Sequence, residues 1–338
     1  MDINNISIPP TGLLNLSKQS GKKRKKNKNK NLYNTCYINS SIQCLFSLKE
    51  FIKGILNHSK GNVLEATKKL INNMKNKKNT DNTSISVLEI KKAMGEFDSK
   101  YNDNNPEDAN EFISDYLNVL RKETLNKNSY EINETNDENY INFLKKFYKK
   151  GSSFITDLFF GILRTENYCI KKCKETFSVK YSSFNILDLP LYYIDINKNQ
   201  TLEIEDIIER YVRKKEISGM SCKKCGGKFY MKTDIYKFPI NLIIYFERND
   251  HNNYIEKDIN IKKTIDLNNF LYKAKTEKTE KTCYNLKGVI YYSFLGNNLS
   301  HYSASCLIDN DWYYFDDDNY ENNKKYYEYD NPILLFYE

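Results

Sequence analysis

A cysteine at the start of an expected helix is the first residue of this sequence whose type and position could support chemistry. Apolar side chains recur at helical spacing after Cys36, at Ile38, Ile42 and Leu45, which predicts a helix that begins at or near Cys36. Unpaired amide groups and the positive end of the helix dipole stabilise a thiolate at such a position. A lone cysteine is more often a small buried apolar residue, and Cys44, further along the same helix, is an example of that alternative.

A cysteine nucleophile needs a general base, and the chain has three histidines. His58 stands at an expected helix end and His251 in a polar loop, so we expect both on the surface. His301 instead opens an expected strand, from which its side chain could project into a cleft. The next strand ends in Asp316 and Asp317, and a carboxylate there could orient and stabilise an imidazolium. The order cysteine, histidine, aspartate is that of papain-like enzymes.

The segment around Cys36 resembles the cysteine box of ubiquitin-specific proteases, which has the pattern Asn-Leu-Gly-Asn-Thr-Cys-Tyr-x-Asn-Ser. Residues 31–40 match nine of these ten positions, and Tyr33 replaces the glycine. In that family the asparagine five residues before the cysteine donates to the oxyanion, so the resemblance assigns this role to Asn31. Residues 12–16 also resemble the start of the box, as if the lysine-rich run were inserted inside it. Asn15 is therefore the alternative, but the intact spacing favours Asn31.

Two later segments resemble the histidine box of the same family, which has the patterns Gly-His-Tyr-x-Ala and Trp-Tyr-x-Phe-Asp-Asp. His301 and Asp316 fall on the catalytic positions, with Asp317 as a helper, and Tyr302 falls on a substrate-binding position. Ser300 replaces the usual glycine, which could narrow the approach for a Gly-Gly tail. The resemblance implies a deubiquitinating thiol hydrolase that cleaves the isopeptide or peptide bond after the C-terminal glycine of ubiquitin.

An acidic segment, residues 106–112, resembles the Gln-Gln-Asp-Ala-x-Glu-Phe segment of the family. The resemblance implies that Asp108 and Glu111 face the arginine-bearing tail of ubiquitin, because carboxylates pair with guanidinium groups. The same acids and Pro106 would also suit an ordinary helix N-terminus, although that explanation does not account for the whole segment.

Two cysteine pairs have a spacing that suits a zinc site. Cys222 and Cys225 form a Cys-x-x-Cys knuckle, and Cys169 and Cys173 offer a second pair some fifty residues earlier. Four thiolates make a closed, structural Zn²⁺ site. A single pair would be equally compatible with a redox function, but two pairs that flank β-rich sequence favour zinc. Their placement resembles the zinc-bearing fingers of the ubiquitin-specific proteases.

Helical periodicity dominates the first third of the chain, including residues 63–74, a helix after Ser86 and a helix over about 107–124. Strand-like runs follow residue 154, at 159–163, 177–181, 238–246, 284–292, 302–308, 312–315 and 333–337. Helices followed by strands predict an α+β fold. Together with the resemblance, this predicts a papain-like fold with a helical thumb, a β-rich palm and inserted zinc-binding fingers. We expect a disordered basic segment over 1–30 and a catalytic domain over 31–338, with the thumb at about 31–155 and fingers and palm at about 156–338.

Charge and composition narrow the choice of partners. The net charge is +8, but residues 21–30 hold seven basic residues and no acid, so the rest of the chain is nearly neutral. That distribution argues against a nucleic-acid adaptor, because phosphate contacts need a basic face on the folded domain. No apolar run is long enough to cross a bilayer and no secretory signal is visible, so we expect a cytoplasmic or nuclear protein that is not secreted.

The expected partners are ubiquitin and ubiquitinated proteins, and we expect a monomer that needs neither nucleic acid nor a membrane. The basic residues of 22–26 could be a nuclear import signal, a contact for acidic partners or a solvated tail. The alternative function is a catalytically impaired ubiquitin-binding protein of the same fold, because Tyr33 and Ser300 depart from the family boxes. The presence of Cys36, His301 and Asp316 argues against that alternative.

Overall fold

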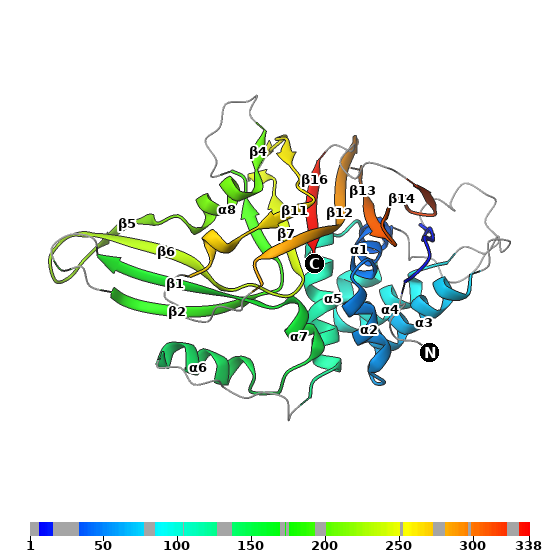
Figure 1. Cartoon of the computed structure of the whole chain (residues 1–338), viewed down its shortest axis with the longest axis horizontal. Coiled ribbons are helices and arrows are strands. Elements are labelled where there is room, and N and C mark those ends of the chain that lie inside the picture. The colour runs from blue at the N-terminus through cyan, green and yellow to red at the C-terminus, as the bar shows by residue number, and fades with distance from the viewer. Residues whose placement is uncertain are drawn as a thin grey trace. The chain divides into compact units, whose positions relative to one another are not determined.

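The computed structural model describes most of the chain (Figure 1). The contacts between its residues divide the chain into two compact units. The first unit comprises residues 1–124, 243–245 and 286–338, and the second comprises 125–242 and 246–285. The described residues are 7–15, 34–77, 85–103, 105–126, 137–169, 173, 176–192, 201–250, 253–272, 281–296, 299–322 and 331–338. The lysine-rich run lies outside them, and the segment boundaries expected near residues 30 and 155 stay predictions.

Five α-helices form the N-terminal part of the first unit. They are α1 (Cys36–Phe46), α2 (Lys49–Asn57), α3 (Asn62–Asn76), α4 (Leu88–Phe97) and α5 (Ala109–Glu123), with a 3₁₀ turn at Ser99–Asn102. Every residue of α1 is buried, whereas α3 and α5 each bury the periodic face that the sequence predicts. The two carboxylate oxygens of Glu123 accept from the N–H groups of Val63 and Leu64 at 3.0 and 2.8 Å, and so cap α3.

An antiparallel sheet completes the first unit. It is built from β13 (Leu299–Ile308), β14 (Asp311–Asp316), β15 (Asn319–Asn322), β16 (Pro332–Tyr337), residues 286–296 of β12 (Cys283–Gly296) and residues 243–245 of β7 (Leu242–Glu247). The strand order is β15-β14-β13-β12-β16-β7, and α1 packs against β13. The expected strand at 238–246 begins only at Leu242, because Pro239 cannot donate to a β-ladder.

The second unit contains a four-stranded antiparallel sheet in the order β2-β1-β6-β5. Its elements are α6 (Glu138–Phe147), α7 (Phe154–Phe159), β1 (Gly161–Cys169), β2 (Thr176–Phe184), β3 (Leu187–Pro190), β4 (Leu202–Glu203), α8 (Ile204–Val212), β5 (Lys215–Ser221), β6 (Lys228–Lys237), β8 (Asn249–Asp250), β9 (Asn253–Tyr254), β10 (Ile259–Asn260), β11 (Thr264–Asp266) and a 3₁₀ turn at Asn268–Phe270. Helix α6 packs on the sheet through aromatic side chains, with the rings of Tyr140 and Tyr236 4.6 Å apart. The expected strand at 159–163 starts at Gly161, since Phe159 is the last residue of α7.

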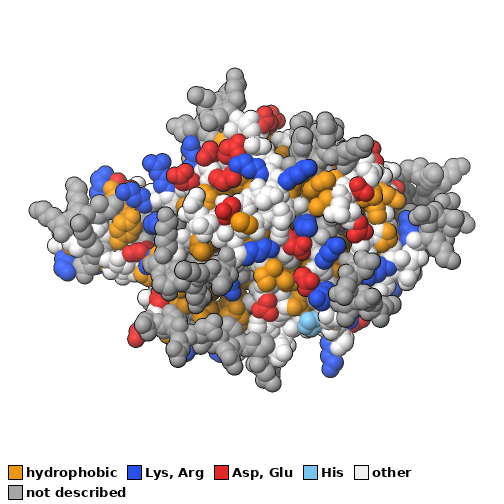
Figure 2. All heavy atoms as spheres, in the orientation of Figure 1, with side chains coloured by type: hydrophobic (Ala, Val, Ile, Leu, Met, Phe, Trp, Pro, Cys, Tyr) orange, Lys and Arg blue, Asp and Glu red, His pale blue; other side chains and the backbone are white. Residues whose placement is uncertain are grey.

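No helix among the described residues is both long and apolar enough to span a membrane. Figure 2 shows lysine and arginine side chains interspersed with aspartate and glutamate over one face of the molecule. This mixture of charges agrees with the nearly neutral composition outside residues 21–30.

A glycine on β12 allows α1 to lie close to the sheet. A Cβ atom added at Gly288 on β12 would lie 2.9 Å from Sγ and 3.1 Å from Cβ of Cys44. Gly288→Ala is therefore expected to lower the free energy of unfolding by about 1–3 kcal/mol through overpacking. Chemical denaturation of Gly288→Ala, Cys44→Ala and the double variant measures the coupling between the two sites. Cys44→Ala removes Sγ and should relieve most of the clash with an alanine at position 288. Strictly additive effects of the two substitutions on the free energy of unfolding would therefore contradict this packing.

Candidate active site

Cys36 is the first residue of α1, and its thiol lies inside the first unit with only 1% of the residue exposed. The preceding Asn34 has a φ of 73°, a left-handed conformation that asparagine tolerates and that turns the chain into the helix. The Cys36 Sγ atom donates to Oδ1 of Asn34 at 3.2 Å. A thiolate at this position would face the amide groups of the first helical turn and the positive end of the helix dipole.

His301 lies on β13 and Asp316 is the last residue of β14, two strands that pair antiparallel. Nε2 of His301 is 2.7 Å from Oδ1 of Asp316. The imidazole also has a side-chain hydrogen bond with Cys36, and Nδ1 is the ring nitrogen that Asp316 leaves for it. The carboxylate of Asp316 and then the hydrogen bond with Cys36 raise the pKa of His301 to about 10, against the opposing effect of burial. Three of the four residues with predicted catalytic roles, Cys36, His301 and Asp316, thus lie together.

A buried polar network adjoins these three residues. Asp317 is 3% exposed and has a φ of 56°. Its Oδ1 atom accepts from Nδ2 of Asn39, one turn after Cys36 on α1, at 3.0 Å, and its Oδ2 atom accepts from Nδ2 of Asn15 at 2.8 Å. Asn39 is not among the site residues predicted from the sequence. An available signal was that this polar residue belongs to a helix next to the predicted nucleophile, where a buried amide needs partners.

The predicted substrate-binding residues divide into two groups. Tyr302 is 5% exposed, its hydroxyl hydrogen-bonds to the backbone of Ala109, and burial raises its pKa. Asp108 is the N-cap of α5 and accepts from the N–H of Asn110 at 2.7 Å, while burial raises the pKa of this carboxyl group. The negative charge of Asp108 also raises the pKa of Tyr302, so these two residues lie close together. Glu111 is more exposed and forms a 2.8 Å ion pair with Lys100.

The remaining residues considered from the sequence are one asparagine and two histidines. Asn31 and His251 lie outside the described residues. His58 stands at the end of α2, partly exposed, with Nδ1 2.8 Å from the carbonyl oxygen of Gly54. The surface location expected for His58 therefore agrees with its partial exposure.

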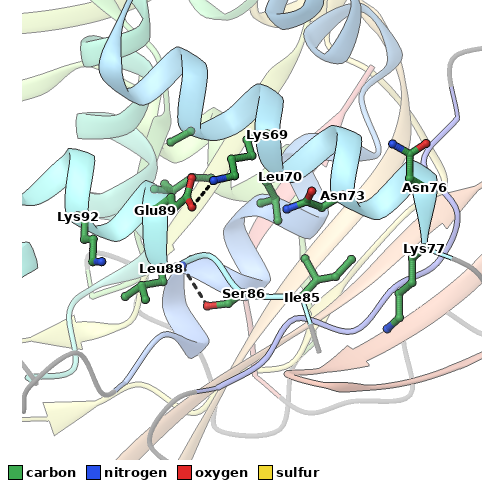
Figure 3. A pocket seen from close by; sticks show the side chains of 12 residues that line it. Lys69, Leu70, Asn73, Asn76, Lys77, Ile85, Ser86, Leu88, Glu89 and Lys92 are labelled. Carbon is green, nitrogen blue, oxygen red and sulfur yellow. Dashed lines mark hydrogen bonds and ion pairs between the residues drawn. The ribbon is translucent and has the colours of Figure 1, made fainter. Parts of the chain in front are cut away.

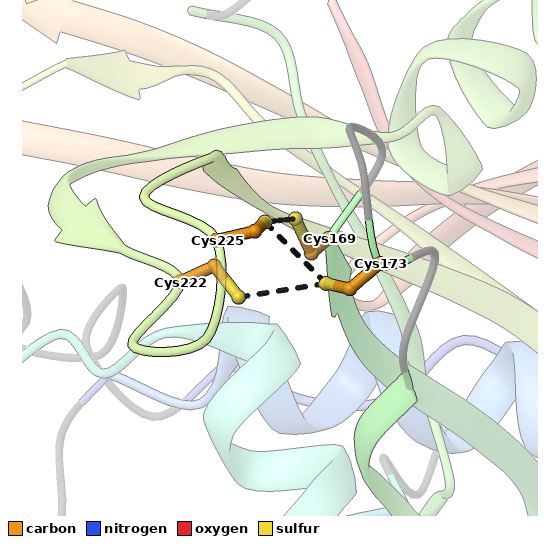
Figure 4. A group of neighbouring side chains, drawn as sticks. All are labelled: Cys169, Cys173, Cys222 and Cys225. Carbon is orange, nitrogen blue, oxygen red and sulfur yellow. Dashed lines mark hydrogen bonds between the residues drawn. The ribbon is translucent and has the colours of Figure 1, made fainter.

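Four cysteine side chains converge in the second unit (Figure 4). Sγ of Cys225 lies 3.4 Å from that of Cys169 and 3.5 Å from that of Cys173, and the sulfurs of Cys173 and Cys222 are 3.6 Å apart. A tetrahedral Zn²⁺ with bonds of about 2.3 Å would hold its sulfur ligands about 3.8 Å apart, close to these distances. The backbone N–H of Gly227 and then the neighbouring thiols lower the pKa of Cys225 to about 6. These four residues could hold a metal ion.

A separate hollow of about 450 Å³ is lined by residues of α3, α4 and the segment before α4 (Figure 3). Leu70, Ile85 and Leu88 contribute apolar lining, and Lys69, which pairs with Glu89 at 2.6 Å, contributes charge. Cys36, His301 and Asp316, the described residues with predicted catalytic roles, do not line this hollow, so it is distinct from the site around Cys36.

The family model described as ubiquitin carboxyl-terminal hydrolase matches residues 27–337 of this chain. The chain belongs to the ubiquitin carboxyl-terminal hydrolase family. The match includes the predicted boxes around Cys36 and His301, and it confirms the family that the sequence resembles.

Known members of the ubiquitin carboxyl-terminal hydrolase family are similar over much of this chain. Usp2 of Drosophila melanogaster is 27% identical over 242 residues, which cover 65% of this chain and 24% of that protein. Ubiquitin carboxyl-terminal hydrolase 2 of Homo sapiens is 26% identical over 307 residues, which cover 82% of this chain and 48% of that protein. The matched region is thus about a quarter to a half of the length of these relatives.

A solved structure shares the fold. A chain of the SAGA Ubp8/Sgf11/Sus1/Sgf73 DUB module bound to ubiquitin aldehyde superposes with a TM-score of 0.72 at 17% identity. The match covers 97% of this chain and 69% of that chain. The predicted α+β fold of papain-like type, with helices before strands, is confirmed.

Proposed function

We propose that this chain is a cysteine-type deubiquitinating hydrolase that cleaves the isopeptide or peptide bond after the C-terminal glycine of ubiquitin. The observation that carries the proposal is the contact of one imidazole, that of His301, with both the Asp316 carboxylate at 2.7 Å and the Cys36 thiol at the start of α1. Family membership supports the reaction class, and similar proteins are named as ubiquitin carboxyl-terminal hydrolases.

In the proposed first step, His301 takes the proton of Cys36 and the thiolate attacks the carbonyl carbon of the terminal glycine. Amide groups at the start of α1 stabilise the negative charge that develops on the carbonyl oxygen. The imidazolium then gives its proton to the departing amine as the carbon–nitrogen bond breaks, which leaves a thioester on Cys36. Because the pKa of His301 is raised to about 10, its acidity is close to that of a lysine ammonium group, the product of an isopeptide cleavage.

In the second step, His301 removes a proton from water, which attacks the thioester and releases the ubiquitin carboxylate. Asp316 accepts from Nε2 throughout, which fixes the ring so that Nδ1 serves Cys36 and then the water. The cycle returns the proton to the thiol, so no redox partner is needed. Among the substrate-binding residues, the exposed carboxylate of Glu111 suits a basic peptide tail, whereas Asp108 and Tyr302 shape the adjoining wall.

We assign the four-cysteine cluster to a structural Zn²⁺ ion held by Cys169, Cys173, Cys222 and Cys225. The sulfur separations of 3.4 to 3.6 Å fit four ligands around one ion. A bound zinc with four thiolates has no open position, so its contribution would be to crosslink the tip of β1 to the turn between β5 and β6.

The proposed function is tested by reaction of the purified chain with ubiquitin that carries a cysteine-trapping electrophile at its C-terminus. We expect a covalent adduct with the wild-type chain and with Cys44→Ala, and no adduct with Cys36→Ala. Mass spectrometry of the intact protein measures the adduct. Ubiquitin binding by a folded wild-type chain without any adduct would instead indicate the catalytically impaired ubiquitin-binding protein.

A further inference from the structure

The segment before the lysine-rich run is part of the first unit, although it is distant from Cys36 in sequence. Within residues 7–15, the N–H of Leu13 donates to the carbonyl oxygen of Asp317 at 2.7 Å. The N–H of Leu14 donates to the carbonyl oxygen of Ile85 at the same distance, and the Leu13 side chain is completely buried. This segment therefore docks against the turn that follows β14, next to the residues that hold His301.

Two further contacts fix the segment against α1 and against the same turn. Nε2 of Gln43 on α1 donates to the carbonyl oxygen of Thr11 at 2.7 Å. A Cβ atom at Gly12 would lie 2.1 Å from the carbonyl oxygen of Asp318, so only glycine allows this approach of the two backbones. The segment is thus positioned by close backbone contacts on both sides.

Asn15 ends this docked segment inside the buried polar network. The residue is 3% exposed, its Oδ1 atom accepts from the N–H of Thr35 at 3.5 Å, and its Nδ2 atom donates to Asp317 at 2.8 Å. Asp317 in turn accepts from Asn39 on α1 at 3.0 Å. One side-chain amide therefore connects the residue before Cys36 to the turn after Asp316.

The chain positions on either side of residues 16–33 consequently lie next to each other. If residues 17–32 are skipped, the sequence runs Asn15, Leu16, Tyr33, Asn34, Thr35, Cys36, and Asn15 stands five residues before the cysteine. Asn31 has the same spacing in the continuous chain. The spacing in the continuous chain favours Asn31, but the hydrogen bonds of Asn15 place its amide in the active centre.

We propose that Asn15, rather than Asn31, is the asparagine that positions the nucleophile, so that the active centre is assembled from two stretches separated by residues 16–33. Asn15 acts through Thr35 and Asp317: it holds the first turn of α1 in register with the turn that follows Asp316. This inference rests on the proposed function, because the expected benefit is a correctly aligned Cys36 for attack on the ubiquitin tail.

The test compares Asn15→Ala with Asn31→Ala in the full chain, using ubiquitin with a fluorogenic C-terminal amide. Active sites are counted with the ubiquitin electrophile, so that kcat is expressed for each reactive cysteine. Asn15→Ala should lower kcat by about 10²-fold with little change in KM, because small misplacements of reacting groups have effects of this size. Asn31→Ala should match the wild type. A merely structural role of Asn15 would lower the number of active sites and the unfolding temperature, but not kcat per site.

A contracted chain without residues 17–32 provides a second variant. It lacks Asn31, and we expect it to react as the wild type does and to lose about the same factor in kcat on Asn15→Ala. Loss of kcat in Asn31→Ala but not in Asn15→Ala would overturn the inference, as would a stably folded contracted chain that is inactive.

Failure of the proposed function is separable from failure of this inference. If the wild-type chain ignores ubiquitin, alkylation of Cys36 by iodoacetamide still reports the alignment of the nucleophile. Asn15→Ala should then lower the rate at which Cys36 is alkylated, because the thiol and the imidazole of His301 are less well aligned without the hydrogen bonds of Asn15. An unchanged rate of alkylation would contradict a positioning role for Asn15.

Discussion

Asp316→Ala is expected to lower kcat by about 10²- to 10⁴-fold and to shift the alkaline limb of the pH profile to lower pH. The hydrogen bond from Nε2 of His301 to Asp316 at 2.7 Å is the largest cause of the raised pKa of His301, about 10. Without the carboxylate, that pKa should fall toward the ordinary value of about 6.5. The imidazolium that pairs with the thiolate would then be lost between about pH 7 and pH 10, a range in which the wild-type chain keeps it.

The raised pKa of His301 also determines how the stability of the folded state changes with pH. The folded-state pKa of His301 lies above its unfolded value, so protonation of His301 favours folding. This contribution is complete below about pH 6.5 and disappears as the pH rises through about 10. Asp316 is 40% exposed in its side chain, so water screens the pair, and we expect the change to be clearer in kcat than in stability.

Kinetics of a fluorogenic ubiquitin amide between pH 6 and 10.5 measure both effects of Asp316→Ala. Asp318→Ala is the matched control, because Asp318 is an exposed carboxylate in the same turn. An alkaline limb that stays in place in Asp316→Ala, or an equal loss in Asp318→Ala, would show that Asp316 does not set the protonation of His301.

The residues around the Cys36 thiol could be predicted from the sequence where a short stretch of neighbouring residues is enough to identify them. Cys36 stands at the start of an amphipathic helix, and His301 and Asp316 stand at strand ends that a reader can locate from short apolar runs. The network of Asp317 with Asn15 and Asn39 is different. Asn15 and Asp317 are 302 residues apart, so only the folded chain brings their side chains together.

Strand β6 and helix α6 of the second unit were also not predicted, because both elements are only partly buried. Strand β6 contains lysine, threonine and aspartate beside its aromatic residues, and half of its positions are only partly buried. Its apolar periodicity is therefore weak. Helix α6 buries only Leu144 fully and contacts the sheet through half-buried aromatic rings, so its sequence does not have the aliphatic stripe of α3 or α5.

The four-cysteine cluster gives the second prediction with a large effect. Cys222→Ser should abolish zinc binding and markedly destabilise the second unit, because zinc binding and folding are coupled when four thiolates converge from segments far apart in sequence. Structural zinc contributes about 10–16 kcal/mol in small zinc-binding peptides. Even a loss of about 3 kcal/mol would lower the unfolding temperature of a unit of this size by about 10 °C.

Metal content by elemental analysis and thermal unfolding test this prediction on the full chain. Wild-type protein should carry about one zinc per chain, as four thiolates close a single tetrahedral site. Cys283→Ser is the matched control, because Cys283 belongs to the same unit but is exposed and lies outside the cluster. It should keep both the metal and the unfolding temperature. Metal-free wild-type protein that unfolds at the same temperature as Cys222→Ser would mean that packing of β1, β5 and β6 holds the four sulfurs together without an ion.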